Sequence, residues 1–241
     1  KNMKKNRIVL CDDYAGEFSI SGVKKAIDKH VHEKKLKIEV IKGRFAKILI
    51  QSYPPIQVVW SRYTSQTVVS LIILLPIIGT VLKTKNLGIQ LLRSTFLFGA
   101  TFCFFSSLKY LQLAQVNAVF QVAPLFVTAL SVFVLRESVG IRRWGGVFVG
   151  MLGAIIIIRP GSTTFSLALI LPIGAALSYA SYLIATKYLS NEEAATTNFL
   201  YTSLIGFVLA SFLAPTTWVP INSSDVFTFF SFGLLGALGH L

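Results

Sequence analysis

The chain has 241 residues, of which 54% are hydrophobic and only 14% are charged, and its formal net charge is +13. An ordinary soluble domain has roughly 25% charged residues and cannot hide this much apolar surface, so the composition argues against a water-soluble fold and favours a lipid environment. A basic balance can also indicate nucleic-acid binding. Beyond residue 48, however, the basic residues stand singly or in small groups between apolar runs, which is typical of loops that flank membrane segments. We therefore expect no nucleic-acid partner.

Residues 1–48 form a compositionally separate piece, because they hold 13 of the 23 Lys and Arg residues and 6 of the 10 Asp and Glu residues. Their pattern predicts a strand, a helix and a strand, a short α/β-like polar segment that we assign to residues 1–50. Asp12, Asp13 and Tyr14 follow the first strand, as in the final strand and helix of some small-molecule methyltransferases, which this segment weakly resembles. It has no glycine-rich cofactor loop, so we expect neither catalytic residues nor a cofactor. A genuine appendage and a fusion or assembly artefact both stay open.

Seven stretches without charged residues follow along the chain. They cover residues 63–82, 94–108, 110–135, 144–158, 160–186, 194–224 and 226–241. A helix rises about 1.5 Å per residue, so about 20 residues cross a hydrocarbon core of about 30 Å, and shorter stretches suffice when flanking Lys and Arg side chains reach the headgroups. The stretches lack the strict alternation of barrel strands. The sequence therefore predicts an all-α membrane protein, a multi-helix transmembrane bundle.

The basic residues between these stretches are distributed unequally between the two sides of the membrane. One side would hold seven of them and the other side two, namely Lys83, Lys85, Arg93, Arg136, Arg142, Arg143 and Lys187 against Lys109 and Arg159. Because cytoplasmic loops collect Lys and Arg, the side with seven should face the cytoplasm. This places the chain around Tyr53 outside, although thirteen basic residues precede it. The conflict indicates that one membrane crossing is missing before Tyr53.

Three groups of residues in the apolar part carry a resemblance to a known family. They are Tyr53, Pro54, Pro55, Trp60, Arg62 and Tyr63; Leu111, Ala114, Ala118, Ala123, Pro124 and Glu137; and Gly146, Gly150, Gly153 and 159–161. In these motifs the chain resembles the EamA family of the drug/metabolite transporter (DMT) superfamily. The resemblance implies ten helices in two inverted repeats. This chain would carry an incomplete set, with a first repeat that lacks its first helix at 53–161 and a truncated second repeat at 165–241.

One polar stripe within an apolar stretch is a candidate lining of a solute cavity. Asn117, Gln121, Pro124 and Thr128 are spaced by four, three and four residues, which puts them on one face of a helix. Secondary carriers bind solutes between repeats, where polar side chains and broken helices face a cavity. The alternative is that these side chains only form hydrogen bonds to neighbouring helices, at about 0.6 kcal/mol each.

A second candidate face lies at the start of the presumed second repeat. Tyr179, Tyr182 and Thr186 share one helical face, and the two rings could stack on a planar solute. Packing against other helices explains the same residues equally well. Arg62 is a further candidate for contact with an anionic solute, because intramembrane ionisable groups are functional candidates by default. It lies close to the start of its segment, so its side chain can also extend to the headgroups.

Prolines within the stretches are candidate hinges, because each removes a backbone donor from its helix. They are Pro76, Pro124 and Pro172. The two cysteines, Cys11 and Cys103, lie far apart, and the spacing of His30 and His32 points them to different helix faces, so we expect no metal site.

The function favoured by these observations is transmembrane transport of a small metabolite or drug-like solute across a cell inner (plasma) membrane. The chain has no Gly-Lys pair and therefore no Walker-type phosphate loop, so we expect a secondary carrier and not a pump. Its partners would be the lipid bilayer and a small-molecule solute, with a homodimer left open. One alternative is a non-transporting truncated or fused membrane remnant with a methyltransferase-derived N-terminal piece. Another is an enzyme, which would need a cofactor loop upstream of Lys1.

Overall fold

The computed structural model of the chain describes residues 45–136, 140–158, 167–189 and 193–238. The predicted strand-helix-strand piece and its methyltransferase-like motif lie outside the described residues, as do Glu137 and Arg159. Residues 45–50, which we assigned to the polar segment, are instead part of a helix that continues to residue 52. Ala46, Leu49 and Ile50 of this helix are buried in the apolar core.

In the described ranges every regular element is a helix, which confirms the predicted all-α class. The α-helices are α3 (Pro55–Leu74), α4 (Ile78–Val81), α5 (Leu87–Ser107), α6 (Leu113–Phe120), α7 (Ala123–Leu135), α8 (Ile141–Ile158), α9 (Ile170–Leu189), α10 (Ala195–Leu213) and α11 (Ser223–Leu238). Short 3-10 segments, η2 (Leu75–Ile77), η3 (Leu167–Leu169) and η4 (Ala214–Thr217), adjoin α3, α9 and α10.

Five helical segments are long and apolar enough to cross a membrane. They are Pro55–Val81, Leu87–Ser107, Leu113–Leu135, Leu167–Leu189 and Ala195–Thr217. The chain is thus a multi-pass membrane protein. The two other predicted stretches are also helical, but α8 with 18 residues and α11 with 16 residues are not among these five.

Three predicted stretches are interrupted, and proline is present at each interruption. In the stretch 63–82, η2 with Pro76 separates α3 from α4. The stretch 110–135 consists of α6 and α7, which are separated at Gln121 and Val122 just before Pro124. The stretch 194–224 ends its regular helix at Leu213, passes through η4 and continues without helical structure to α11. Proline lacks the N–H that would extend a helical ladder and restricts the residue before it, so all three interruptions follow from local chemistry.

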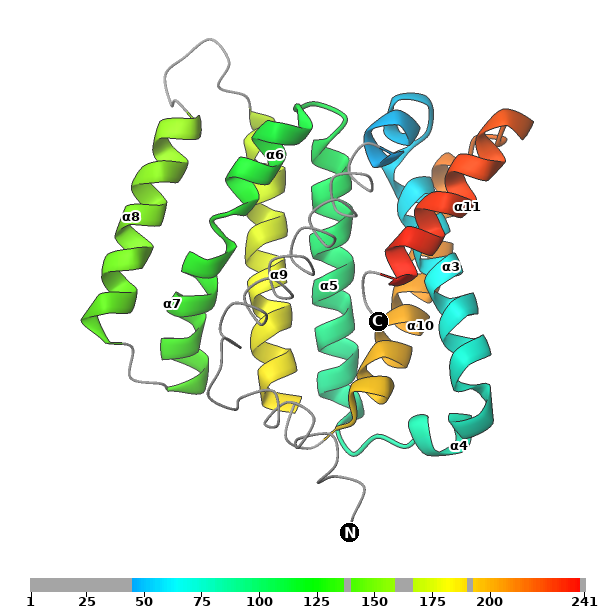
Figure 1. Cartoon of the computed structure of the whole chain (residues 1–241), viewed down its shortest axis with the longest axis horizontal. Coiled ribbons are helices and arrows are strands. Elements are labelled where there is room, and N and C mark those ends of the chain that lie inside the picture. The colour runs from blue at the N-terminus through cyan, green and yellow to red at the C-terminus, as the bar shows by residue number, and fades with distance from the viewer. Residues whose placement is uncertain (1–44, 137–139, 159–166, 190–192, 239–241) are drawn as a thin grey trace, which may run out of the picture. The chain divides into compact units, whose positions relative to one another are not determined.

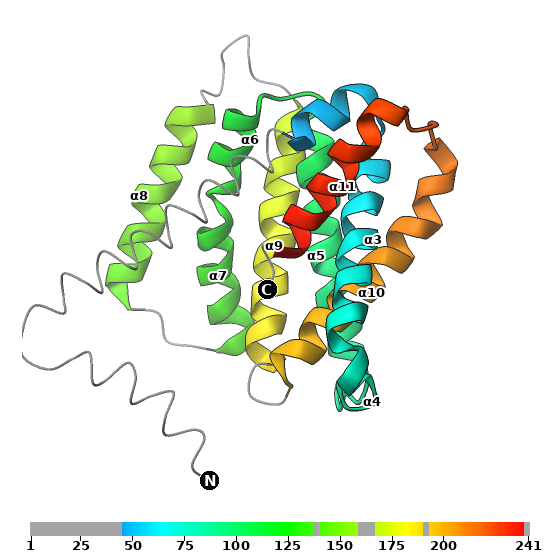
Figure 2. The ribbon, with the colours of Figure 1, turned by 45° about the vertical axis from the view of Figure 1, so that its right-hand side comes forward.

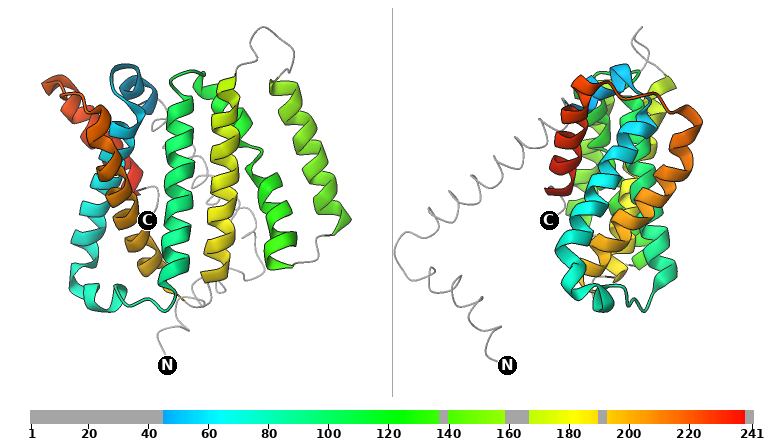
Figure 3. Two further views of the ribbon diagram at one scale, coloured as in Figure 1. Left: turned by 180° about the vertical axis from the view of Figure 1, so that it is seen from behind. Right: turned by 90° about the vertical axis from the view of Figure 1, so that its right-hand side faces the viewer.

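Helix α5 lies in the middle of the bundle. It packs most extensively against α9 and also contacts α10 and α3, while α3 packs against α10 and α11 (Figures 1 and 2). The side view in Figure 3 shows α3 between α11 and α10. Helices α6 and α7 cover the other side of α9, and α8 contacts only α6 and α7 among the pairs with extensive contact.

Close helix contacts in the bundle rely on glycine. A Cβ atom added at Gly206 of α10 would overlap the ring of Tyr63 of α3, and one added at Gly233 of α11 would overlap the side chain of Ser65. Glycine lets neighbouring helices approach closely in lipid, where packing has to replace the hydrophobic effect. The glycines of α8 behave differently, because an added Cβ at Gly146 would meet no described atom within 4 Å.

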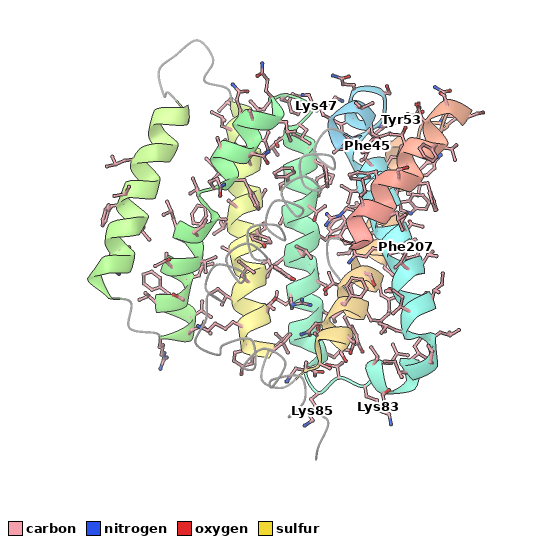
Figure 4. The ribbon with its side chains drawn as sticks, in the orientation of Figure 1. Phe45, Lys47, Tyr53, Lys83, Lys85 and Phe207 are labelled. Atoms are coloured by element: carbon pink, nitrogen blue, oxygen red, sulfur yellow. The ribbon has the colours of Figure 1, made fainter. Side chains whose placement is uncertain are left out.

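The outer faces of the helices expose large apolar side chains. Phe212, Phe133 and Leu167 are 84%, 79% and 79% exposed. Such surfaces are rare on soluble monomers but suit contact with acyl chains. Three lysines lie at the ends of the bundle, Lys83 and Lys85 at one end and Lys47 at the other (Figure 4). The Lys47 ammonium donates hydrogen bonds to the backbone oxygens of Leu108 and Leu111, at 2.7 and 2.9 Å.

Candidate functional site

The inner face of α5 carries a row of polar side chains. Gln90, Arg93, Ser94 and Thr101 are all buried, with 6% exposure or less. Their spacing of three, one and seven residues keeps them within about one half of the helix surface, the half that faces α3, α9 and α10. Polar groups within membrane helices avoid lipid and face the bundle interior.

Arg93 is the centre of a hydrogen-bond network that joins α5 to α9 and α10. Its Nε donates to Thr186 Oγ1 at 2.7 Å, and its Nη2 donates to the hydroxyl of Tyr182 at 3.1 Å. Its Nη1 donates to the backbone oxygen of Asn198 at 3.1 Å and to Thr202 Oγ1 at 2.8 Å. The guanidinium carbon lies 4.8 Å from the centre of the Tyr182 ring, within the range of a cation–π contact.

The position of Arg93 corrects the sequence prediction, which counted it among the loop residues that set the membrane orientation. The helix begins at Leu87, seven residues before the apolar stretch that starts at Ser94. Arg93 therefore lies inside the bundle, with an exposure of 4%. The sequence does contain a signal for this, because Gln90, Arg93 and Ser94 recur at helical spacing. A prediction based on uncharged runs leaves out Gln90 and Arg93, because the run begins at Ser94.

Several polar atoms of α5 and α3 are buried and accept or donate no hydrogen bond within the described part of the chain. Gln90 Nε2 donates to Asn198 Oδ1 at 2.5 Å, but Gln90 Oε1 has no partner. The same holds for Ser94 Oγ and for both amide atoms of Gln66 on α3. A buried polar group without a partner costs about 1–3 kcal/mol. The bundle interior that contains the buried Arg93 guanidinium therefore also contains polar atoms without hydrogen-bond partners among the described residues.

Aromatic rings extend from Arg93 along α9 toward α6. The rings of Tyr182 and Tyr179 are stacked, with centroids 5.8 Å apart and an interplanar angle of 30°. Tyr179 is followed by Phe120 at 5.4 Å, and Phe120 by Phe104 at 5.4 Å. Tyr179 and Tyr182, predicted as a pair on one face, thus lie side by side next to the guanidinium. Sequence spacing indicated their shared face but not the arginine.

Arg62 occupies a second position on the bundle interior. Its Nη1 donates to Thr101 Oγ1 at 3.1 Å, and its guanidinium carbon lies 5.6 Å from the ring centre of Tyr63 and 6.0 Å from that of Phe105. The side chain therefore points toward α5, whereas the sequence left open an extension to the headgroups. Thr101 is also 3.3 Å from the hydroxyl of Tyr63, so Arg62 belongs to a polar group between α3 and α5.

The stripe predicted on one helical face is divided by the interruption between α6 and α7. Asn117, Gln121 and Pro124 are exposed in the described structure, and Thr128 is half-buried. The Thr128 hydroxyl donates to the backbone oxygen of Pro124 at 2.9 Å, a contact within its own helix. Within the described residues, no hydrogen bond or ring contact joins this stripe to Arg93. A cavity-lining role for the stripe stays a prediction.

The three candidate hinge prolines occupy different settings. Pro76 lies in η2 between α3 and α4, and Pro124 lies at the start of α7. Pro172 lies in the first turn of α9 and interrupts nothing, because the first N–H groups of a helix have no partner within it. A hinge role stays a prediction for all three. Among the described residues no three metal-ligating side chains gather.

The two carboxylates that the structure describes bind groups at the ends of helices. Glu193 Oε1 accepts hydrogen bonds from Thr84 Oγ1 at 2.6 Å and from the Lys85 N–H at 2.8 Å. The hydrogen bond from Thr84 is the main reason why the pKa of Glu193 is lowered from its ordinary value. Asp225 Oδ2 accepts from the Tyr53 hydroxyl at 2.7 Å.

Comparison with known proteins agrees with the membrane bundle. Residues 40–159 match the EamA-like transporter family. The riboflavin transporter of Vibrio cholerae serotype O1 is 32% identical over 167 residues, which are 67% of this chain and 56% of that protein. The riboflavin transporter of Brucella anthropi is 33% identical over 132 residues, 53% of this chain and 46% of that protein.

A more distant relative is named for a different substrate. The S-adenosylmethionine uptake transporter of Rickettsia prowazekii is 26% identical over 172 residues, 70% of this chain and 58% of that protein. The chain thus spans about half the length of the curated relatives that it matches. No solved structure matches it significantly.

Proposed function

This chain belongs to the EamA-like transporter family, and from that premise we propose that the protein carries a small organic metabolite across the inner membrane as a secondary carrier. The observation that carries the proposal is the buried Arg93 network within a bundle of apolar helices. Buried ionisable residues are costly in lipid and mark solute or ion pathways. The family resemblance implies two repeats. The network joins α5, which lies in the first repeat, to α9 and α10, which lie in the second.

The relatives support a vitamin or nucleoside-like solute. Two of them are named for riboflavin and one for S-adenosylmethionine, and both compounds combine a planar heteroaromatic ring with a polar chain. The stacked rings of Tyr179 and Tyr182 offer a surface for such a ring. The adjacent Arg93, Thr186 and Thr202 offer hydrogen-bonding groups for the polar part.

The proposed orientation places the end of the bundle with Lys83 and Lys85 in the cytoplasm, because basic residues concentrate on that side. A cysteine introduced for Lys85 should react with a membrane-impermeant maleimide in inside-out vesicles and not in intact spheroplasts. A cysteine introduced for the exposed Tyr110, near the other end of α5, should show the opposite pattern. The reverse labelling pattern would contradict the orientation.

Transport itself is tested with the full-length protein in liposomes. Riboflavin, S-adenosylmethionine, amino acids and nucleosides are offered outside, with and without a proton or sodium gradient. We expect at least one solute to enter faster than into protein-free liposomes. If none does, the proposal is wrong and the alternative of a non-transporting membrane remnant gains support.

A further inference from the structure

The charge of Arg93 is not neutralised by the groups that bind it. All four hydrogen bonds of its side chain within the described residues go to hydroxyl or backbone carbonyl oxygens, which are neutral acceptors. Of the carboxylates that the structure describes, Glu193 is bound to Thr84 and Lys85, and Asp225 is bound to Tyr53. A cation that is hydrogen-bonded but has no counter-charge carries most of the desolvation cost of a buried ion.

A second guanidinium adds positive charge to the same interior. Arg62 binds Thr101, which lies eight residues beyond Arg93 on α5, or about 12 Å along the helix axis. Asp225 is the one described carboxylate within a helix of the bundle, and it lies in the first turn of α11, bound to the hydroxyl of Tyr53. Arg62 thus places a second guanidinium between α3 and α5.

The surroundings of Arg93 can accept an additional ligand chemically. Among the described residues, Ser94 Oγ, next to Arg93 in the chain, is buried without a hydrogen-bond partner, and the same holds for the amide of Gln66 on α3, a helix that contacts α5. A hydroxyl and an amide NH₂ group can both donate to an anionic oxygen. The stacked rings of Tyr182 and Tyr179 begin directly under the guanidinium.

We infer that Arg93 is the residue that selects the solute, and that it binds the carboxylate or phosphate of an anionic compound whose planar ring stacks on Tyr182 and Tyr179. This inference rests on the proposed transport function and names its substrate class. A carboxylate or phosphate replaces the neutral acceptors Thr186 and Thr202 on the guanidinium, because an ionised acceptor forms shorter and stronger hydrogen bonds. The bond to Tyr182 holds the guanidinium over the aromatic surface. A cationic solute is repelled by Arg93.

Riboflavin and riboflavin 5′-phosphate form a matched pair of probes, since they share one ring system and differ by a phosphate. Binding to the full-length protein is measured at equilibrium by flavin fluorescence in phosphatidylcholine nanodiscs. We expect the phosphate form to bind about 10- to 100-fold more tightly, the size expected for a charge-assisted hydrogen-bonded pair. S-adenosylmethionine has one carboxylate, but its sulfonium and ammonium groups make it a net cation, so it is expected to compete weakly.

Variants then assign the preference to one side chain. Arg93→Gln should reduce the preference for the phosphate form to less than about threefold, with riboflavin affinity changed less than the affinity for its phosphate. Arg93→Lys keeps the charge without the planar fork and should retain part of the preference. Lys83→Gln removes a charge from the exposed loop at the end of the bundle and should leave the preference unchanged. If Arg93→Gln does not fold, the wild-type preference and Arg93→Lys still provide the test.

Three outcomes would overturn the inference. They are failure of both flavins to bind, equal or tighter binding of the uncharged flavin or of S-adenosylmethionine, and a phosphate preference that Arg93→Gln leaves intact. Loss of the preference when phosphatidylglycerol is added would assign the site to a lipid headgroup and would also overturn it. The proposed function fails separately, when flavin phosphate binds with the expected preference but no solute enters liposomes.

Discussion

The contact between α3 and α10 at Gly206 gives a stringent test of the packing. Tyr63 is almost fully buried, its hydroxyl is 3.3 Å from Thr101 Oγ1, and its ring lies 5.9 Å from that of Phe98. A methyl group at Gly206 would overlap three atoms of the Tyr63 ring. Because Thr101 and Phe98 restrict the ring, Gly206→Ala must move either Tyr63 or α10. Gly146→Ala is the matched control, since a Cβ there meets no described atom within 4 Å.

The predicted quantity is the difference in free energy of unfolding between Gly206→Ala and Gly146→Ala. Each gains up to about 1 kcal/mol in helix propensity, whereas only Gly206→Ala incurs the overpacking cost of about 1–3 kcal/mol. The propensity term cancels in the difference, which leaves about 1–3 kcal/mol. At about 2–4 °C per kcal/mol for a chain of this size, Gly206→Ala should unfold about 2–12 °C below Gly146→Ala.

Thermal unfolding of the two full-length variants is measured in the same detergent. The readout is the fraction of protein that stays monodisperse as the temperature rises. Both variants are compared at the same scan rate, because membrane proteins commonly unfold irreversibly and apparent midpoints depend on the rate. Equal midpoints for the two variants, or a higher midpoint for Gly206→Ala, would refute the proposed close contact. Tyr63→Leu combined with Gly206→Ala should recover part of the loss, since the overlapping ring is then absent.

Two further predictions concern polar contacts at the ends of the bundle. Gln57 is fully buried and forms a pair of hydrogen bonds with the backbone of Val219, at 2.8 and 3.2 Å. Gln57→Leu should therefore speed amide hydrogen exchange of residues 218–222 and leave the exchange of α5 unchanged. Unchanged exchange at residues 218–222 would count against this prediction. Because the pKa of Glu193 is lowered from 4.5 mainly by the hydrogen bond from Thr84, its contribution to stability is present above about pH 4.5 and is lost as the pH falls through the lowered pKa. Glu193→Gln should therefore flatten the pH dependence of the thermal midpoint below pH 4.5, and an unaltered pH profile would contradict this.

Some features of the fold follow from the residues alone, because they depend on local chemistry. Uncharged apolar runs of this length have to satisfy their backbone groups internally in lipid, so helices could be predicted. Five of the predicted stretches coincide with helical segments that are long and apolar enough to cross a membrane. The shared face of Tyr179 and Tyr182 also follows from helical spacing. The interruption before Pro124 could have been anticipated from the missing N–H group.

Other features depend on which helices meet, and no local pattern contains that information. Arg93 lies beside a run of uncharged residues and next to a predicted loop, and only the packing of α5 against α9 and α10 surrounds it with Thr186, Thr202 and Tyr182. The sequence by itself thus determined that the chain is helical and lies in a membrane, since the free energy of transfer from water to lipid depends on the type of each residue and not on its tertiary contacts. The tertiary structure decided which charge is buried and what it touches, because those contacts join residues about 90 to 110 positions apart.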